Sequence, residues 1–384
     1  MKIALLTNGL FPYVIGGMQK HSTNMAIYLS KVGVKVDLYY IQDDNYPAPD
    51  ELHEELFDRV TGIQLFPVKH FKLPYFPGHH YPECLWKSYW MYRDLRANLE
   101  GVDFVYSQGY MGWASIIAKK AKRSGLPPIG VNFHGLEALQ EKRSLFSEAL
   151  HCFSPRLVGW NLRNADFALS LGGQLDALVA DAGVGRNQIL HSFNGIGRAW
   201  VPGRGRGDRR RPIRCIFVGR ASERKGLKEL NEVMQRLAGD GQFEFVLVGP
   251  IPEGDQVDSP NVTYMGEVRD EVELRRIYQG GELLLCPSYS EGMPTVILEA
   301  IACGLFVVAT DVGAVRLAVV PGTGCLIPPR SSEALFDALH DYLMGRVCFE
   351  KEIAEELIDK FRWESVASHL CHTLEAALSQ PLTP

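Results

Sequence analysis

Residues 283–309 read LLLCPSYSEGMPTVILEAIACGLFVVA. The run from Leu283 to Cys286 is typical of a short buried strand, and the run from Phe306 to Ala309 is typical of another. Between them, Pro294 is a natural first residue for a helix that continues through the apolar segment Val296 to Ala302. Strand, helix and strand in this alternation indicate a parallel, doubly wound α/β sheet, so this stretch decides the fold class.

The same stretch carries two glutamates. Glu291 lies in the Gly/Pro turn before the predicted helix, and Glu299 lies about one and a half turns inside it. A carboxylate among Val, Ile, Leu and Ala is costly to bury without a partner. Two interpretations follow: a structural glutamate that caps a neighbouring loop, or a pair of carboxylates that faces a polyhydroxylated ligand.

The alternation of strands and helices extends over the rest of the chain. In the second half we expect strands at 214–218, 243–248 and 262–265, and helices at 227–237, 271–279, 332–343 and 350–378. In the first half we expect strands at 2–6, 34–41, 104–107, 129–133, 166–171 and 189–193. Two similar α/β halves place any shared ligand in the cleft between them.

Composition marks the boundary between these halves. Residues 199–212 are rich in Gly, Pro and Arg and lack apolar periodicity, which predicts a linker between a first domain over 1–198 and a second that begins at 213. Residues 43–93 look irregular and are rich in Pro, Tyr, Trp and His. They are expected to form an insertion, either specificity loops and a docking surface or an aromatic satellite core.

The overall composition is that of a folded, soluble protein. The chain has 384 residues, of which 46% are hydrophobic and 22% charged, and this length favours two domains. Its net charge of −5 argues against a nucleic-acid binder. The eight cysteines form no CxxC or zinc spacing, which favours a reducing cytosol. The N-terminal residues read as a first strand and not as a signal peptide, and no apolar run is long enough to span a membrane.

Two loops offer positive charge at the same edge of the predicted second sheet. Arg220 and Lys225 lie five residues apart in a glycine-flanked loop after a strand. The amides of residues 292–295 lie at a helix N-terminus, which is a second anion site. One diphosphate could therefore contact both loops, although a solvated basic turn remains the alternative for the first.

Three features of the first half allow a ligand role or a structural one. Gly16 and Gly17 precede a helix, and His134 follows a strand at its carboxyl end, where open α/β sheets bind ligands. The basic run 119–123 contacts an anionic lipid surface or simply stabilises a helix C-terminus.

No DxD-type pair ends a strand and no residues have metal-ligand spacing, so the cationic loop would neutralise a diphosphate without a metal. The sequence contains neither GxSxG nor a P-loop, which removes the hydrolase and NTPase interpretations.

Taken together, these motifs resemble family 4 of the retaining glycosyltransferases, which has the GT-B fold with two Rossmann-like domains facing a central cleft. The matching segments are Gly16-Gly17, His134-Gly135, Asn194-Gly195-Ile196, Phe217 to Arg220 with Lys225-Gly226, Leu247-Val248-Gly249, and Pro287 to Gly304 with the Glu-x7-Glu spacing of Glu291 and Glu299. The resemblance spans nearly the whole chain. It implies a second domain over 213–362 and a terminal helix over 363–384 that packs back towards the first domain.

The resemblance also implies a role for each site residue. Arg220 and Lys225 would bind the donor diphosphate, and Glu299 would accept hydrogen bonds from the ribose. The donor sugar would be held by Glu291 and by His134 from the other domain. The backbone of the segment Gly292, Met293, Pro294 and Thr295 would also contact this sugar. Gly16 and Gly17 would let backbone approach the phosphate and the acceptor, and the backbone at Val268 would receive the base. The catalytic residues would be Arg220, Lys225, Glu291 and His134.

The function implied is a metal-independent, retaining transfer of a sugar, without a cofactor, from a UDP- or GDP-sugar to a hydroxyl of a glycan or lipid-linked acceptor. Cell-envelope polysaccharide, lipopolysaccharide or glycolipid synthesis is the expected context, in the cytoplasm or peripherally on the cytosolic membrane face, with no nucleic-acid partner. The alternative is a non-catalytic GT-B protein that binds a nucleotide sugar or glycan. One departure from the family pattern is the run Val312 to Arg316, which lacks the second glycine and the glutamate of Gly-Gly-x-x-Glu and puts the packing of a donor-side loop in question.

Overall fold

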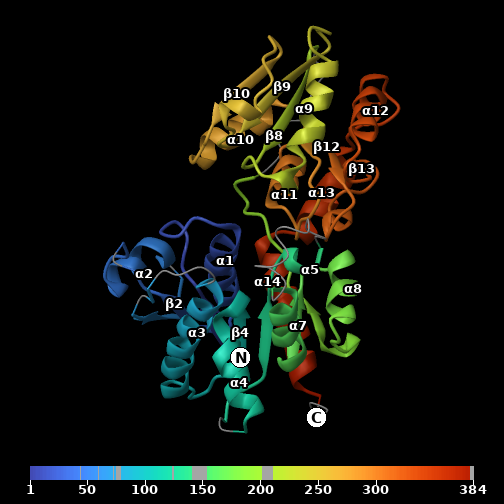
Figure 1. Cartoon of the computed structure of the whole chain (residues 1–384). Helices are drawn as coiled ribbons and strands as arrows, with labels where there is room; N and C mark the ends of the chain where they lie inside the picture. Colours follow the sequence, from blue (N-terminus) through green and yellow to red (C-terminus); the bar gives the residue numbers. More distant parts are fainter. Residues whose placement is uncertain are drawn as a thin grey trace. The chain divides into compact units, whose positions relative to one another are not determined.

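The computed structural model describes residues 1–43, 45–58, 60–71, 73–74, 79–122, 125–140, 154–200 and 211–380. The chain divides into two compact units. The first comprises Met1–Leu171, Leu175–Phe193 and Trp363–Pro384, and the second comprises Gly172–Gln174 and Asn194–Arg362. Each contains one parallel β-sheet (Figure 1). Most of the predicted linker, residues 201–210, lies outside the described residues.

The first unit is built on a seven-stranded sheet of order β3-β2-β1-β4-β5-β6-β7. Its strands are β1 Lys2–Thr7, β2 Lys35–Ile41, β3 Ile63–Val68, β4 Phe104–Gln108, β5 Ile129–Asn132, β6 Phe167–Ser170 and β7 Ile189–His191. Its α-helices are α1 Gly17–Lys31, α2 Pro49–Phe57, α3 His80–Ala97, α4 Trp113–Lys120, α5 Glu137–Gln140, α7 Ser154–Asn164, α8 Gln174–Asp181 and α14 Trp363–Leu378. Its described residues also form the 3₁₀ turns η1 Gly109–Gly112 and η2 Arg186–Gln188.

Alternating side chains of β1 enter two separate apolar cores, one on each face of this sheet. Ile3 and Leu5 pack in the core that also holds Met25 of α1, whereas Ala4 and Leu6 pack in the core that holds Met91 of α3. Neighbouring residues of a strand point to opposite faces. Because both faces are covered, the strand reads as a continuous apolar run in the sequence.

The helix at the end of the chain belongs to the first unit. Trp363, at the start of α14, stacks on Tyr28 of α1 with ring centroids 6.0 Å apart, and its residues Val366, Ala367 and Leu370 share the apolar core of α1. Figure 1 shows this red helix among the blue and green elements of that unit. The sequence predicted one helical stretch over 350–378, but the structure breaks it after Lys360.

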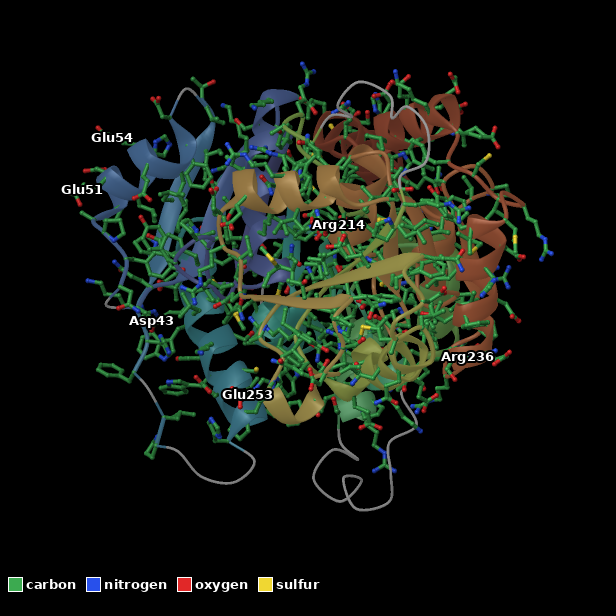
Figure 2. All side chains as sticks on the ribbon, turned by 90° about the horizontal axis from the view of Figure 1, so that it is seen from above. Asp43, Glu51, Glu54, Arg214, Arg236 and Glu253 are labelled. Atoms are coloured by element: carbon green, nitrogen blue, oxygen red, sulfur yellow. The ribbon has the colours of Figure 1, made fainter. Side chains whose placement is uncertain are left out.

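The prediction of irregular structure over residues 43–93 is wrong. This segment contains α2, β3 and most of α3, and β3 extends the sheet by pairing in parallel with β2. Aromatic residues obscured the helical period of α3, because rings lie on several sides of this helix and pack on one another: Trp86 stacks on Tyr89 with centroids 5.9 Å apart. Glu51 and Glu54 project outward from α2 (Figure 2).

The second unit is built on a six-stranded sheet of order β10-β9-β8-β11-β12-β13. Its strands are β8 Ile213–Val218, β9 Phe243–Val248, β10 Val262–Gly266, β11 Leu283–Cys286, β12 Phe306–Thr310 and β13 Gly324–Ile327. Its α-helices are α9 Leu227–Arg236, α10 Glu271–Gly280, α11 Thr295–Ala302, α12 Ser332–Leu343 and α13 Lys351–Lys360. Its 3₁₀ turns are η3 Glu223–Lys225, η4 Glu253–Asp255 and η5 Val315–Leu317.

The second unit begins earlier than the sequence indicated. It includes residues 194–198, which were predicted to belong to the first domain. The N–H of Ile196 donates to the Phe361 carbonyl at 2.8 Å, and Ile196 forms a parallel bridge with Arg362. Backbone pairing between segments so far apart in the sequence leaves no local signal.

The helix α11 lies in the interior of the second unit. Ile297, Leu298, Ala300 and Ile301 are completely buried. A helix that is apolar on all sides is expected in the interior, and this helix places Glu299 there too, with 6% of the residue exposed. Among the described residues, no helix is long and apolar enough to cross a membrane.

Candidate donor-binding site

The loops after β8 and β11 form the centre of the candidate site in the second unit. These two strands are neighbours in the parallel sheet, so the loops leave the same edge side by side. Gly226 has a φ of +65°, and a Cβ atom there would lie 2.0 Å from the Pro287 carbonyl oxygen. Only glycine allows this close approach of the first loop to the second.

Lys225 and Glu291 meet between these loops. Lys225 Nζ lies 2.5 Å from Glu291 Oε1, and Arg224 Nη1 lies 3.4 Å from Glu291 Oε2. Arg224 Nη1 also donates to the Ser290 carbonyl at 3.1 Å. The carboxylate is therefore buried between two cations, which compensates much of its desolvation cost.

The sequence predicted Lys225 and Glu291 as site residues, but its motifs did not identify Arg224. Its position beside Lys225 in the same loop was the available signal. Its guanidinium contacts both Ser290 and Glu291, so it ties the first loop to the residues that carry the carboxylate. The N–H of Tyr289 donates to the Arg224 carbonyl at 2.7 Å and reinforces this link.

Arg220 lies at the start of the first loop and is exposed. Among the residues that the structure describes, its side chain makes no hydrogen bond or ion pair. Gly249, at the end of β9, has a φ of +136°, and a Cβ atom there would lie 1.9 Å from the Gly219 carbonyl oxygen. This contact fixes the backbone next to Arg220 and leaves its guanidinium available to an anion.

The turn from Gly292 to Thr295 is held through its carbonyl groups. Asn194 Nδ2 donates to the Met293 carbonyl at 2.6 Å, and the N–H of Ala314 donates to the Gly292 carbonyl at 2.8 Å. The N–H groups of Gly292 and Met293 donate to no other group in the described part of the chain. Pro294 follows, and Thr295 is the first residue of α11. The turn thus presents amide donors at a helix N-terminus, where an anion or a hydroxyl oxygen binds favourably.

The loop that departs from the family pattern packs directly below this turn. Gly313 has a φ of +55°, and a Cβ atom there would lie 2.0 Å from the Glu291 carbonyl oxygen. The one glycine present is therefore at the position of closest approach. Three residues after Gly313, Arg316 donates from Nε to Asp311 Oδ1 at 3.0 Å.

Glu299 is held by a tyrosine from the neighbouring helix. Tyr278 of α10 is completely buried, and its hydroxyl donates to Glu299 Oε2 at 3.3 Å. Burial and the nearby Glu299 charge raise the pKa of Tyr278 well above its usual value. The tyrosine therefore stays protonated and acts as the donor.

Val268 lies along the same carboxyl edge of the second sheet, on the side of β8 that faces away from β11. It follows β10, which lies two strands from β8 in the sheet order, a separation of about 10 Å. The N–H of Gly249 donates to the Gly266 carbonyl at 2.8 Å and joins the ends of β9 and β10. The spacing suits a ligand that extends along the carboxyl edge of the sheet, from the cationic loop towards Val268.

In the first unit, Gly16 and Gly17 begin α1. Gly16 is extended, and a Cβ atom there would lie 2.1 Å from Gln19 Oε1, whereas nothing lies within 4 Å of the corresponding position at Gly17. Gln19 Nε2 donates to Asn8 Oδ1 at 2.7 Å. Packing therefore does not require a glycine at position 17, whereas a side chain at position 16 would displace Gln19.

His134 follows β5 in the first unit with a left-handed backbone, φ +54°. Its N–H donates to Asn132 Oδ1, and its Nε2 hydrogen-bonds with Gln108 Oε1, both at 2.7 Å. The His21 ring meets it edge to face with centroids 4.8 Å apart. Burial, together with His21, holds the pKa of His134 well below its usual value. His134 is therefore a neutral group at physiological pH.

This pKa shift predicts a pH dependence of stability. Since the folded protein binds the His134 proton more weakly than the unfolded chain, its contribution is complete above about pH 6.5 and decreases as the pH falls below that value. We expect His134→Asn to reduce the slope of unfolding free energy between pH 5 and 6.5 by up to about 1.4 kcal/mol per pH unit. Urea unfolding across this range measures it, with the exposed His372→Asn as control. An unchanged slope in His134→Asn would contradict the assignment.

The predicted site residues are thus distributed over both units. Arg220, Lys225, Val268, Glu299 and residues 291–295 gather at the carboxyl edge of the second sheet, whereas Gly16, Gly17 and His134 lie in the first unit. In the described residues, no three His, Cys, Asp or Glu side chains are grouped to hold a metal ion.

Two parallel Rossmann-like sheets, with polar loops at the carboxyl ends of their strands, define the GT-B class of glycosyltransferase folds. Sucrose-phosphate synthase from Thermosynechococcus elongatus has the same fold, with a TM-score of 0.76 over 98% of this chain and 99% of that chain at 19% identity. Anabaena HepE in complex with UDP-glucose aligns with a TM-score of 0.65 over 98% of this chain and 100% of that chain at 18% identity.

Two family models match successive parts of the chain: Glycosyltransferase Family 4 over residues 15–196, and Glycosyl transferases group 1 over residues 212–344. The protein belongs to glycosyltransferase family 4. The Bacillus subtilis glycosyltransferase TuaC, named for teichuronic acid biosynthesis, is 34% identical over 145 residues, which are 38% of this chain and 36% of TuaC. The match therefore spans less than two thirds of that relative.

Proposed function

We propose that the protein is a retaining glycosyltransferase that moves a sugar from a nucleoside-diphosphate donor to an acceptor hydroxyl. The observation that carries the proposal is the group of Lys225, Arg224 and buried Glu291 at the carboxyl edge of the second sheet. Cations fixed beside a carboxylate suit a donor whose diphosphate is anionic and whose sugar is rich in hydroxyls.

The second unit would hold the donor. Arg220 and Lys225 bind the diphosphate, and Glu291 with the amides of Gly292 and Met293 binds the sugar hydroxyls. Glu299 accepts hydrogen bonds from the ribose, and the backbone at Val268 receives the base. Along the sheet edge, the backbone after β10 that is assigned to the base lies two strands from the cationic loop after β8, and the turn after β11 that is assigned to the sugar lies beside that loop.

Catalysis would rest on charge stabilisation. The acceptor oxygen forms a bond to the anomeric carbon as the bond to the diphosphate oxygen breaks, both on the same face of the sugar, and the acceptor proton passes to the departing diphosphate. The cations of Arg220 and Lys225 stabilise the negative charge that develops on this group. The neutral imidazole of His134 would form a hydrogen bond with the sugar. Gly16 and Gly17, which lack side chains, would let the backbone approach the phosphate and the acceptor.

The acceptor is proposed to be a glycan or lipid-linked sugar of the cell envelope, with peripheral attachment to the cytosolic membrane face. The name of TuaC supports this class of product. The basic end of α4 gives it little support, because Lys119 Nζ pairs with Asp166 Oδ2 at 2.7 Å and Lys120 bonds to Asn164. The aromatic surface of α3 is the better candidate for acceptor contact, since Tyr89 is 48% exposed.

The nucleotide is the first property to test. We expect UDP to raise the melting temperature more than GDP or ADP. A ligand that binds the folded state and is present at a hundred times its Kd adds about 2.7 kcal/mol to stability. The binding of UDP-glucose by HepE supports this choice. A thermal-shift series with the three nucleotides measures it. A larger shift with GDP or ADP would assign another base, and no shift with any of them would overturn the donor proposal.

A second experiment tests transfer and metal independence together. With the stabilising nucleotide sugar, slow release of free nucleotide is expected even without an acceptor, and the rate should persist in excess EDTA. A binding protein without catalytic activity would release none. A rate lost in EDTA and restored by Mg²⁺ would contradict the metal-independent mechanism.

A further inference from the structure

The contact between Tyr278 and Glu299 points to a role beyond packing. The Tyr278 hydroxyl is the donor to one oxygen of the Glu299 carboxylate, Oε2, at 3.3 Å. Both residues are buried, the tyrosine completely and the glutamate to within 6% of full burial. A glutamate has three side-chain torsions and loses substantial rotamer freedom when it is held in one conformation.

We propose that Tyr278 is a positioning residue that selects ribonucleotides: its hydroxyl holds Oε2 of Glu299 and thereby directs the other oxygen, Oε1, to the hydroxyls of the donor ribose. The inference rests on the proposed function, because it requires Glu299 to bind the ribose. A site built to hydrogen-bond a hydroxyl discriminates strongly against a ligand that lacks it. The chemical preference expected is for a ribonucleoside diphosphate over its 2′-deoxy analogue.

The surroundings of Tyr278 fix its ring. The Trp200 ring meets it nearly edge on, with centroids 5.7 Å apart and planes at 72°. The guanidinium of Arg275 lies over Trp200, 5.8 Å from the ring centroid. With the ring restrained, the hydroxyl can direct the carboxylate. Because the pKa of Tyr278 is raised, the phenol retains the proton that it donates throughout the physiological range.

The variant Tyr278→Phe tests the proposal because it removes one oxygen and keeps the ring. Calorimetric titration with UDP and with 2′-deoxy-UDP measures the preference for the ribose hydroxyl. We expect the wild-type protein to favour UDP, and the variant to bind UDP about tenfold more weakly while its affinity for 2′-deoxy-UDP changes less than twofold. An unchanged ratio of the two affinities in Tyr278→Phe would overturn the inference.

Tyr289→Phe is the matched control. The Tyr289 hydroxyl also donates to a buried glutamate of the second unit, Glu229 Oε2, at 2.5 Å. The variant Tyr289→Phe should leave the ratio of UDP to 2′-deoxy-UDP affinity unchanged, because Glu229 is assigned no ribose contact. If both phenylalanine variants lower the ratio equally, the effect is general destabilisation and the inference fails.

Two further measurements separate the possible failures. In a Glu299→Ala background, Tyr278→Phe should have no additional effect on UDP affinity, and an undiminished effect there would show that Tyr278 does not act through Glu299. If Tyr278→Phe does not fold, Glu299→Asp replaces it, since its shorter carboxylate is withdrawn from the hydroxyl, and a retained preference would refute the inference. Wild-type protein that binds neither nucleotide overturns the proposed function itself, whereas binding of both with equal affinity overturns only the ribose selection.

Discussion

Replacing Lys225 by alanine is expected to lower kcat/KM for sugar transfer by about 10²- to 10³-fold, the usual effect of removing one group that stabilises developing negative charge. Lys225 is the cation fixed most closely to Glu291, at 2.5 Å, and would move little when the diphosphate departs. A group already in place stabilises the transition state without reorganisation. Steady-state kinetics with the donor identified by thermal shift measure the loss.

Lys228→Ala is the control for this variant. Lys228 lies three residues further along the chain and is exposed on α9. Its replacement by alanine removes the same charge from the same region of the chain. Its kcat/KM should remain within twofold of the wild-type value. Near wild-type turnover in Lys225→Ala, or an equal loss in both variants, would remove Lys225 from the mechanism.

Glu299→Ala is expected to lower kcat/KM by about 10²-fold, mainly through the KM for the donor, because hydrogen bonds to a charged group contribute about 1.5–3 kcal/mol each. Glu299 lies on α11, with only 6% of the residue exposed, and its carboxylate is the one charged group of this helix. The loss of binding should appear equally in calorimetric titration with UDP.

The buried Glu282 provides the matched control. It is also 6% exposed, but it immediately precedes β11, at the opposite end of the strand from Glu291. Glu282→Gln should change stability and leave the donor KM unaltered. If Glu299→Ala has a normal KM, or if both variants raise it equally, the assignment of Glu299 to the donor fails.

Local periodicity was sufficient to predict the parallel architecture. The strand over 283–286, the helix through Val296 to Ala302 and the strand over 306–309 all form where their apolar runs indicate. Such runs record burial on both faces of a sheet, which each segment carries in its own residues. Periodicity did not predict the structure of the aromatic segment over 43–93. Rings on several sides of α3 hide the period that distinguishes a helix from irregular chain.

The types of residue in the candidate site could be predicted from the chain alone, since Arg220, Lys225, Glu291 and Glu299 stand in a recognisable order. How the residues of the second unit meet became visible in the folded protein. Lys225 and Glu291 are 66 residues apart in the chain, and Asn194 and Met293 are 99 apart. Arg224, Asn194 and Tyr278 orient the site through such contacts. Side-chain hydrogen bonds between distant segments depend on how the loops and helices pack, and no short stretch of sequence contains that information.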